Sequence, residues 1–469
     1  MNNQSPASIL ERQSRAFLRD GPPDLTQRRA TLKRLAHAVK ANADDLAEAV
    51  RADFGHRSRH ETLMAEIFPV IAAVRHARFH LWRWMRPRLV WPGLELAPSR
   101  GRIVQQPLGV VGVVSPWNYP VQLALAPLVA ALAAGNRVMI KPSELTPRTA
   151  EALADMLGGL FPEEDVAVVQ GGPEVGAAFC RLPFDHLLFT GSTPVGRKVL
   201  AATAENLTPT TLELGGKSPC VIAPAADLAE AAASIAAGKL MNAGQTCIAP
   251  DYVLLPAGSS QQFVQHFVGA VTKLYPTLLD NADYTSVING QHYARLAQLI
   301  EEAKQGGAKI VAIDPANENP PPQSRKLPPT LIVDPGENLA VMREEIFGPV
   351  LPVVGYETFE AALDFVNARP RPLALYYFGP EDQNLQKLLA RTHSGGVTVN
   401  ETLSHFIAEN LPFGGIGPSG MGAYHGEAGF RAFSHAKPVL LQSRLNSRIL
   451  LHPPYGKVTE AILRFLLRG

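Results

Sequence analysis

The sequence predicts an α/β protein with two α/β domains, the first built on a doubly wound parallel sheet, and with a small β arm. Short apolar segments alternate with helical patterns over residues 108–214, which is typical of a parallel sheet covered by helices on both faces. A second alternation of the same kind follows residue 215. Residues 87–107 are rich in Pro, Gly and alternating apolar residues, which favours an extended hairpin. A length of 469 residues suits two or three domains.

The N-terminal part, residues 6–53, is expected to be helical because Leu32, Leu35 and Val39 recur at helical spacing. Residues 60–86, rich in aromatic residues and arginine, are expected to form another long helix. The first alternation then predicts strands at 109–115, 137–141, 166–170, 186–190 and 211–214, with helices at 121–134, 147–157, 173–182 and 193–206 between them. The second predicts helices at 228–240, 261–274 and 293–305, strands at 252–255, 309–313 and 331–333, and a further helix and strand over 358–400.

Composition and charge exclude several classes of protein. The 44 Lys and Arg residues nearly balance the 42 Asp and Glu residues, whereas a dedicated nucleic-acid binder carries a basic surplus, so no nucleic-acid partner is expected. Cys180, Cys220 and Cys247 are few and far apart, which excludes a disulfide framework and favours a reducing, cytoplasmic location. The N-terminus has no apolar core of a secretory signal, and the longest apolar run, 123–134, is too short to span a membrane.

Three motif matches are rejected on their context. Residues 415–420 match G-x-G-x-x-G, but no predicted strand precedes them and Pro418 stands where a helix should begin. Residues 214–218 end like a phosphate-binding P-loop, but Thr211 occupies the position of its first glycine. The histidine pairs at 56 and 60 and at 76 and 80 lack the Glu of H-E-x-x-H and a nearby third ligand, so no metal is expected.

Polar and glycine residues gather just after the strands of the first alternation. Ser115, Asn118, Lys141, Gly191 and Ser192 all lie at or just beyond a predicted strand end. Because ligands of doubly wound sheets bind at the carboxyl ends of the strands, we expect a cofactor site there.

Four side chains are candidates for chemistry, and each has a structural alternative. Asn118, bracketed by two prolines, is either part of a turn or a fixed amide donor for an oxyanion. Glu213, at the end of an apolar strand, is either ion-paired or a general base with a raised pKa. Cys247 follows a polar, glycine-containing loop and is either a packed thiol or an accessible nucleophile. Glu345, just before a Gly-Pro turn, is either a surface charge or a carboxylate that grips a ribose hydroxyl.

Seven short motifs in one order connect these features. They are WNYP (117–120), KPSE (141–144), FTGST (189–193), LELGGK (212–217), GQTC (244–247), EEIFGP (344–349) and PFGG (412–415). The set resembles the aldehyde dehydrogenase superfamily over nearly the whole chain. The C-terminal motifs, from Asn410 to His435, resemble its short class 3 branch, and within that branch the chain is similar to the coniferyl aldehyde dehydrogenases.

The resemblance implies NAD(P)-dependent oxidation of a small-molecule aldehyde to the carboxylate. Cys247 is the implied nucleophile, which forms a thiohemiacetal and then a thioester, and its backbone N–H joins Asn118 as an oxyanion donor. Glu213 is the implied general base for hydrolysis of the thioester. Tyr424 stands where longer family members carry a second Glu, so a proton relay through that Glu is not expected here.

The resemblance also implies where the cofactor binds. Its adenosine ribose is assigned to Lys141 and Glu144, its pyrophosphate to Gly191 and Ser192 at a helix N-terminus suited to anions, and its nicotinamide end to Trp117, Glu345 and Phe347. A carboxylate at position 144 favours NAD because it repels a 2′-phosphate, and the class 3 branch also uses NADP.

The domains follow from the same resemblance. It implies a Rossmann-like dinucleotide-binding domain over residues 1–86 and 108–214, a catalytic domain over 215–410 and a β oligomerisation arm formed by 87–107 and 430–450. An apolar edge strand seeks a partner, so a homodimer is expected.

The substrate stays open between several interpretations. Trp117, Tyr119, Phe406 and Phe413 either pack in the core or line an apolar tunnel for aromatic aldehydes such as coniferyl aldehyde. The alternatives among enzymes are a medium-chain aliphatic aldehyde dehydrogenase, a semialdehyde dehydrogenase, including one that passes its thioester to coenzyme A, and a thiol esterase without cofactor. The alternative outside enzymes is a catalytically silent structural member, against which the presence of both Cys247 and Glu213 argues.

Overall fold

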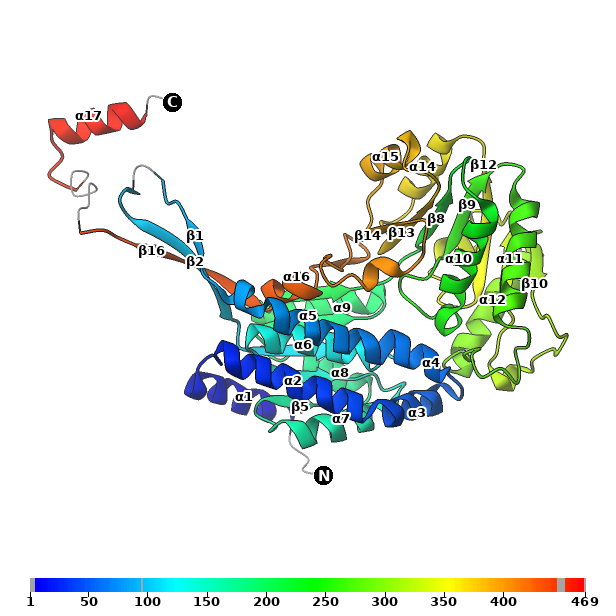
Figure 1. The fold of residues 1–469 in the computed structure, drawn as a ribbon, viewed down its shortest axis with the longest axis horizontal. Coiled ribbons are helices and arrows are strands. Elements are labelled where there is room, and N and C mark those ends of the chain that lie inside the picture. Colours follow the sequence, from blue (N-terminus) through cyan, green and yellow to red (C-terminus); the bar gives the residue numbers. More distant parts are fainter. Residues whose placement is uncertain (1–4, 94–95, 445–451, 468–469) are drawn as a thin grey trace.

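The computed structural model describes residues 5–93, 96–444 and 452–467, which form three sheets with their helices. The first sheet and the N-terminal helices make one body, the second sheet and its helices make another, and a narrow arm projects from the first body (Figure 1). The α/β class predicted from the alternation is confirmed.

The first sheet has six strands in the order β15-β7-β6-β3-β4-β5, and its strands are parallel except for β15. The chain builds one side of β3 with β4 and β5 and then crosses to the other side with β6 and β7, so the order reverses at β3. Such a reversal opens a crevice at the carboxyl ends of the strands. The bounds are β3 (Val110–Val114), β4 (Arg137–Lys141), β5 (Val166–Val168), β6 (His186–Thr190), β7 (Thr210–Glu213) and β15 (Gly420–Met421).

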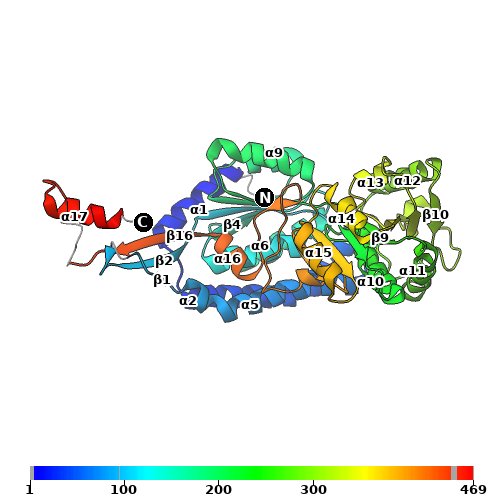
Figure 2. The same cartoon turned by 90° about the horizontal axis from the view of Figure 1, so that it is seen from above.

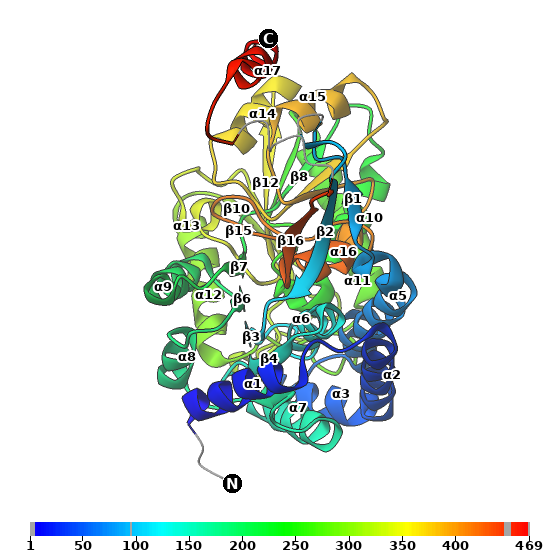
Figure 3. The ribbon, with the colours of Figure 1, turned by 90° about the vertical axis from the view of Figure 1, so that its left-hand side faces the viewer.

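Helices cover both faces of this sheet, as a doubly wound sheet requires. Helices α8 and α9 lie on one side and α2 and α5 on the other, and α9 and α2 lie on opposite sides of β4 (Figures 2 and 3). All 13 residues of α6 are buried, so the longest apolar run of the sequence is a core helix. The helical segments are α1 (Pro6–Asp20), α2 (Leu25–Ala41), α3 (Ala43–Phe54), α4 (Arg59–Thr62), the π-helical η1 (Leu63–Ile67), α5 (Phe68–Met85), α6 (Gln122–Ala134), α7 (Pro147–Leu160), α8 (Pro173–Cys180), α9 (Thr193–Thr203) and the 3-10 turn η3 (Ala204–Asn206).

The second sheet has seven strands in the order β10-β11-β12-β9-β8-β13-β14, with β10 antiparallel to its neighbour and the others parallel. Its strands are β8 (Pro219–Ile222), β9 (Tyr252–Pro256), β10 (Lys309–Ala312), β11 (Thr330–Val333), β12 (Val350–Tyr356), β13 (Ala374–Phe378) and β14 (Gly396–Val399). Its helical segments are α10 (Leu228–Leu240), η4 (Met241–Gly244), α11 (Ser260–Leu274), α12 (Gly290–Gln305), η5 (Pro322–Ser324), α13 (Ala340–Arg343), α14 (Phe359–Asn367), α15 (Gln383–Arg391) and η6 (Ser404–Phe406).

The arm is an antiparallel sheet in the order β1-β2-β16, in which β2 pairs along its whole length with β16. Its strands are β1 (Arg88–Val90), β2 (Arg100–Pro107) and β16 (Ser434–Leu441). The strand begins at Ser434 rather than at Phe430 because Gly426–Ala432 forms helix α16. Residues 445–450 of the expected arm, 94–95 of its hairpin and 1–4 of the first domain lie outside the described residues.

Helix α17 (Lys457–Leu466) follows the arm and is set apart from the two bodies (Figure 1). Its apolar side chains Val458, Leu463, Phe465 and Leu466 are exposed. Within the described residues, no helix is both long enough and apolar enough to cross a membrane.

Candidate active site

A cavity of about 240 Å³ lies at the carboxyl ends of β3, β6 and β7, where the first body meets the second. Three parts of the chain that are far apart in sequence form its walls: the strand ends of the first sheet, the loop before β9, and residues of the second body between 292 and 347. The lining residues are Pro116, Trp117, Asn118, Leu123, Thr190, Gly191, Ser192, Glu213, Leu214, Gly215, Cys247, His292, Arg295, Glu345 and Phe347.

Cys247 lies in the wall of this cavity, on the loop between η4 and β9. The loop owes its shape to Asn242 and Ala243, which both adopt left-handed backbone conformations with φ of 54° and 51°. Such conformations are uncommon for residues other than glycine and are held in place by the surrounding structure. Cys180 and Cys220 are buried and do not line the cavity, so the alternative of a merely packed thiol describes these two.

The surroundings of Cys247 favour its thiol over its thiolate. Burial is the main cause, and together with the charges of Glu345 and Glu213 it raises the pKa of Cys247 to about 12. The backbone N–H groups of Cys247 and Ile248 act in the opposite direction. A base or a positive charge brought into the cavity would therefore be needed to generate the thiolate.

Asn118 lies in the turn that follows β3 and is buried. Its side-chain Nδ2 donates a hydrogen bond to the backbone oxygen of Gln245 at 3.2 Å, so the turn after β3 is joined to the loop that carries Cys247. Asn118 therefore belongs to a turn and also lines the cavity with its amide side chain.

Glu213 is the last residue of β7 and lines the same cavity. Its side chain is buried, and neither carboxylate oxygen receives a hydrogen bond from the described residues. Burial raises the pKa of Glu213 well above its usual value. The alternative of an ion-paired Glu finds no partner among the described residues, and a buried carboxylate without donors is the kind of exception that marks a functional site.

Glu345 and Phe347 come from the second body. The Glu345 carboxylate packs against Gly215, where an added Cβ would lie 2.2 Å from Oε1. Burial, followed by the charge of Asp251, raises the pKa of Glu345 to about 8. Phe347 has a left-handed backbone with φ of 53°, and its ring meets the Trp117 ring edge-on at 5.4 Å.

Gly191 and Ser192 lie between β6 and α9. A Cβ at Gly191 would lie 2.6 Å from the Phe189 ring, so glycine allows this close approach. Ser192 is the N-cap of α9, and its side chain makes no capping hydrogen bond to the described backbone. Gly191 and Ser192, which precede the first N–H groups of this 11-residue helix, both line the cavity.

Lys141 and Glu144 lie at the end of the neighbouring strand β4 and do not line the cavity. Lys141 is buried, and its Nζ donates to the backbone oxygen of Pro142 at 2.7 Å. Glu144 is 41% exposed in its side chain, with its Oε2 3.6 Å from Lys141 Nζ. Burial lowers the pKa of Lys141, while Glu144 opposes this shift.

These residues fit a dinucleotide. The buried Oε1 of Glu345 receives no hydrogen bond from the described residues, so it can accept one from a ribose hydroxyl. The N-terminus of α9 suits a pyrophosphate. Since β3 and β4 are adjacent strands, the Lys141–Glu144 corner lies beside the turn that carries Trp117 and Asn118.

Two further cavity residues, His292 and Arg295, were not among the candidates chosen from the sequence. Both project from α12. The His292 ring meets the Trp117 ring edge-on at 5.1 Å, and Arg295 donates to the backbone oxygens of Glu345, at 3.3 Å, and Ile346. Their sequence context is that of an ordinary amphipathic helix. The feature of the sequence that could have indicated them is a pair of polar residues three positions apart in the first turns of this helix.

Comparison with known proteins decides the family. The profile described as "Aldehyde dehydrogenase family" matches residues 14–439. The chain belongs to the aldehyde dehydrogenase family. The predicted family and the predicted oxidation of an aldehyde to the acid with NAD(P) are thereby confirmed.

Curated relatives of this aldehyde dehydrogenase match it along almost its whole length. The coniferyl aldehyde dehydrogenase of Pseudomonas sp. (strain HR199 / DSM 7063) is 47% identical over 465 residues, covering 98% of this chain and 96% of the relative. A protein of Caulobacter vibrioides named "Probable coniferyl aldehyde dehydrogenase" is 50% identical over 464 residues, covering 98% and 95%. The predicted similarity to coniferyl aldehyde dehydrogenases is confirmed.

Solved structures of other aldehyde dehydrogenases share the fold. Staphylococcus aureus AldH in its substrate-bound state superposes with a TM-score of 0.92 at 35% identity, covering 98% of this chain and 99% of that one. A mutant of the indole-3-acetaldehyde dehydrogenase AldA of P. syringae, in complex with NAD+ and IAA, has a TM-score of 0.83 at 25% identity, covering 93% and 88%.

Proposed function

We propose that this aldehyde dehydrogenase oxidises aromatic aldehydes such as coniferyl aldehyde, with Cys247 as nucleophile, Glu213 as general base and Asn118 as oxyanion donor. The observation that carries this assignment is the cavity whose wall includes all three side chains. The substrate class is taken from the coniferyl aldehyde dehydrogenases that are 47–50% identical. Medium-chain aliphatic aldehydes and semialdehydes are the competing substrates.

The first stage forms a bond between the Cys247 sulfur and the aldehyde carbon. As the thiol gives its proton to water and the sulfur attacks, the carbonyl oxygen gains negative charge and a tetrahedral thiohemiacetal results. Asn118 Nδ2 and the backbone N–H of Cys247 stabilise this oxygen, and loss of one such donor typically costs about 3 kcal/mol of the barrier. For this role Asn118 exchanges its bond to the Gln245 carbonyl for one to the substrate oxygen.

The chemistry that bound NAD(P) supplies is acceptance of a hydride from the substrate carbon. The thioester that remains on Cys247 is hydrolysed by water, from which Glu213 takes a proton. The raised pKa of Glu213 makes it a stronger base than an ordinary carboxylate, and the same oxyanion donors act a second time. The carbon–sulfur bond then breaks, the carboxylic acid leaves, and Glu213 returns its proton to the sulfur.

The cofactor is proposed to bind along the strand ends of the first sheet. Lys141 and Glu144 hold the adenosine ribose, Gly191 and Ser192 the pyrophosphate, and the nicotinamide half meets Trp117, Glu345 and Phe347. The carboxylate of Glu144 favours NAD over NADP because it repels a 2′-phosphate.

Aromatic residues near Glu213 and Cys247 support an aromatic substrate. Burial is the main cause of the raised pKa of the Tyr424 hydroxyl, and the charges of Glu213 and Cys247 also raise it. Tyr424 meets Phe413 edge-on at 6.1 Å, and Phe413 meets Phe406 edge-on at 5.4 Å. These three rings do not line the cavity, whereas Trp117 does and offers its edge and face to an aromatic aldehyde.

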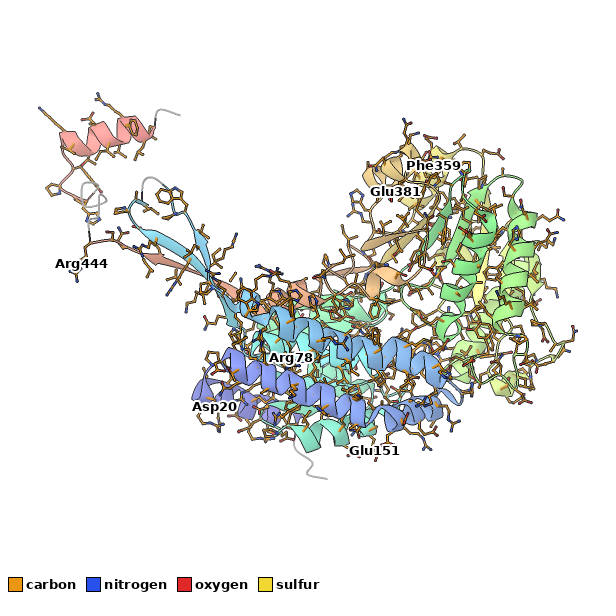
Figure 4. The ribbon with its side chains drawn as sticks, viewed as in Figure 1. Asp20, Arg78, Glu151, Phe359, Glu381 and Arg444 are labelled. Carbon is orange, nitrogen blue, oxygen red and sulfur yellow. The ribbon has the colours of Figure 1, made fainter. Side chains whose placement is uncertain are left out.

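We propose a division into a dinucleotide-binding domain (1–86 and 108–214), a catalytic domain (215–410) and an oligomerisation arm (87–107 and 430–450). The arm presents side chains on both faces and at both edges, with Arg444 at its far end (Figure 4). Strand β14 is the edge of the seven-stranded sheet, and an open edge on each copy supports a homodimer in which the arm pairs with the partner. Free cysteines support a cytoplasmic location.

An initial-rate screen for NADH absorbance tests the proposed function. Cinnamyl aldehydes, including coniferyl aldehyde, are expected to show the highest kcat/KM, followed by benzylic and then aliphatic aldehydes. Cys247→Ala should abolish NADH formation, whereas the matched variant Cys180→Ala should keep it. Preference for an aliphatic aldehyde would overturn the substrate class, and equal loss in the two variants would overturn the assignment of the nucleophile.

A further inference from the structure

Behind the cavity wall lies a buried ion pair that the proposed mechanism does not use. The side chains of Arg57 and Glu66 are both fully buried, with Arg57 Nη1 3.1 Å from Glu66 Oε1. Neither residue lines the cavity. A buried ion pair is costly to desolvate and is retained where it fixes a specific arrangement of the chain. The contacts of Arg57 and Glu66 show which segments this pair holds.

Arg57 binds the backbone of the proposed oxyanion donor. Its Nη1 donates to the backbone oxygen of Asn118 at 2.8 Å, and Asn242 Nδ2 donates to the same oxygen at 3.0 Å. The guanidinium carbon of Arg57 also lies 4.8 Å from the centre of the Tyr119 ring. The peptide that follows the Asn118 side chain is therefore held by two donors and a ring contact.

Glu66 binds the other side of the same turn. It belongs to the π-helical segment η1, and such segments are frequent at functional sites. Its Oε2 accepts hydrogen bonds from the backbone N–H groups of Val121, at 2.7 Å, and Gln122, at 3.2 Å, where α6 begins. Arg57 and Glu66 thus clamp the turn between β3 and α6 from both sides.

Glu61, from the same stretch of chain, binds the loop of the nucleophile. Its Oε1 accepts a hydrogen bond from the backbone N–H of Asn242 at 3.0 Å, and its Oε2 accepts one from the Thr285 hydroxyl at 2.7 Å. Asn242 is the first of the two left-handed residues that shape the loop before Cys247. Residues 57–66 therefore hold both the Asn118 turn and the Cys247 loop.

We propose that Arg57 is a positioning residue that fixes the Asn118 amide relative to the Cys247 sulfur. The inference rests on the proposed roles of these two residues. Because Arg57 grips the Asn118 carbonyl, its loss frees the turn and misdirects Nδ2. A misplacement of about 1 Å lowers a reaction rate by about 100-fold, so kcat should fall. The KM for NAD(P) should change little, because of its proposed ligands only Trp117 belongs to this turn.

The test variants must not leave a buried charge without a partner. Arg57→Met alone leaves Glu66 buried and unpaired, so it is combined with Glu66→Gln, whose amide oxygen can still accept from Val121. Arg57→Lys is the second variant, since it keeps the ion pair but loses the planar fork of the guanidinium. The matched control is Arg28→Met: Arg28 is also a buried arginine, and it donates to Ala133 and Ala134 at the opposite end of α6.

A double-mutant cycle with Asn118→Ala tests whether Arg57 acts through Asn118, because effects that act through a shared partner are not additive. In the native background the Arg57→Met/Glu66→Gln variant should lose kcat by about 10- to 100-fold with little change in the KM for NAD(P). In the Asn118→Ala background the same change should cost no more than about twofold. Arg28→Met should keep kcat in both backgrounds. If the double variant does not fold, Arg57→Lys carries the same cycle.

Two results would overturn the inference alone: a native kcat in the Arg57 variants, or losses that multiply fully with that of Asn118→Ala. A native kcat in Asn118→Ala by itself is a different outcome, which overturns the proposed role of Asn118 and the inference with it.

Discussion

Two buried glutamates, Glu213 in the cavity wall and Glu66 behind it, show how differently this protein treats the same side chain. Both are buried, and burial raises the pKa of each. Glu66 faces Arg57 and two backbone N–H groups, which oppose the shift. Glu213 receives no hydrogen bond from the described residues. The difference separates a carboxylate that holds the structure from one that is left available for chemistry.

This contrast follows from the cost of burying polar groups. A buried carboxylate without partners is expensive, and proteins keep such groups chiefly where the unmet hydrogen bonds will be made to a substrate, a cofactor or a water. Glu345 Oε1 resembles the Glu213 oxygens, because it receives no hydrogen bond from the described residues. Glu66 Oε1 also receives none, but it lies 3.1 Å from Arg57 Nη1 in an ion pair. Substitution of Glu213 should therefore lower activity, whereas substitution of Glu66 should lower stability.

The largest effect is expected for Glu213→Gln on turnover. Removal of a general base typically lowers a rate by about 10²- to 10⁴-fold, and because Glu213 acts after hydride transfer, one equivalent of NADH per active subunit should still form in a rapid first phase. Stopped-flow and steady-state absorbance measure the two phases. A steady-state kcat equal to that of the native enzyme would remove Glu213 from the mechanism.

The next effect is expected for Glu66→Ala on stability. It leaves Arg57 as an uncompensated buried charge and frees two N–H groups at the start of α6, so a loss of about 3–5 kcal/mol is expected. The midpoint of denaturant unfolding measures it. Glu66→Gln, which keeps an acceptor for the N–H groups, is the control and should lose less. Both variants lack the charge of Glu66, so equal losses would show that the two N–H groups contribute little, and a loss below about 1 kcal/mol in both would show that the ion pair with Arg57 contributes little.

A smaller effect is expected for Glu213→Gln on the pH dependence of stability. The folded-state pKa of Glu213 is raised, so above its ordinary value near 4.5 the unfolded chain releases a proton that the folded protein retains. That linkage destabilises the native enzyme increasingly as pH rises. The Tm of Glu213→Gln should therefore exceed that of the native enzyme by a margin that grows as the pH rises above about 5. A margin that shrinks with rising pH would contradict the raised pKa.

The smallest effect is expected for Glu144→Gln on the choice of cofactor. Its carboxylate is partly exposed, so its repulsion of a 2′-phosphate is screened by water and amounts to about 1 kcal/mol, or about fivefold in the NADP to NAD ratio of kcat/KM. Glu151→Gln, on the surface of α7 (Figure 4), is the matched control and should leave the ratio unchanged. An unaltered ratio in Glu144→Gln as well would remove Glu144 from cofactor selection.

The fold class was predictable because the strands of the two domains are short, apolar and separated by helices. The same is true of Asn118, Glu213 and Cys247 as candidates. Each stands out locally, either beside prolines, at the end of an apolar strand or after a glycine-containing loop. That the three residues lie in one cavity depends on the tertiary structure, and the sequence indicated it only through the resemblance to a family.

The supporting residues were not predictable from the sequence, because nothing in their neighbourhood distinguishes them. His292 and Arg295 occupy ordinary positions on an amphipathic helix. Arg57 and Glu66 look like surface charges in a charged helical region, and their roles depend on contacts with residues about 55 to 61 positions away. Such contacts appear once the chain has folded.

The most direct test of the Cys247–Glu213 pair is peptide mass spectrometry of Glu213→Gln after rapid mixing with coniferyl aldehyde and NAD and quenching in acid. The expected result is an acyl group, attached as a thioester, on the peptide that contains Cys247. An acyl group on the peptide of Cys180 or Cys220, or NADH formed in the first phase without any acylated cysteine, would contradict the assignment of the nucleophile and its base.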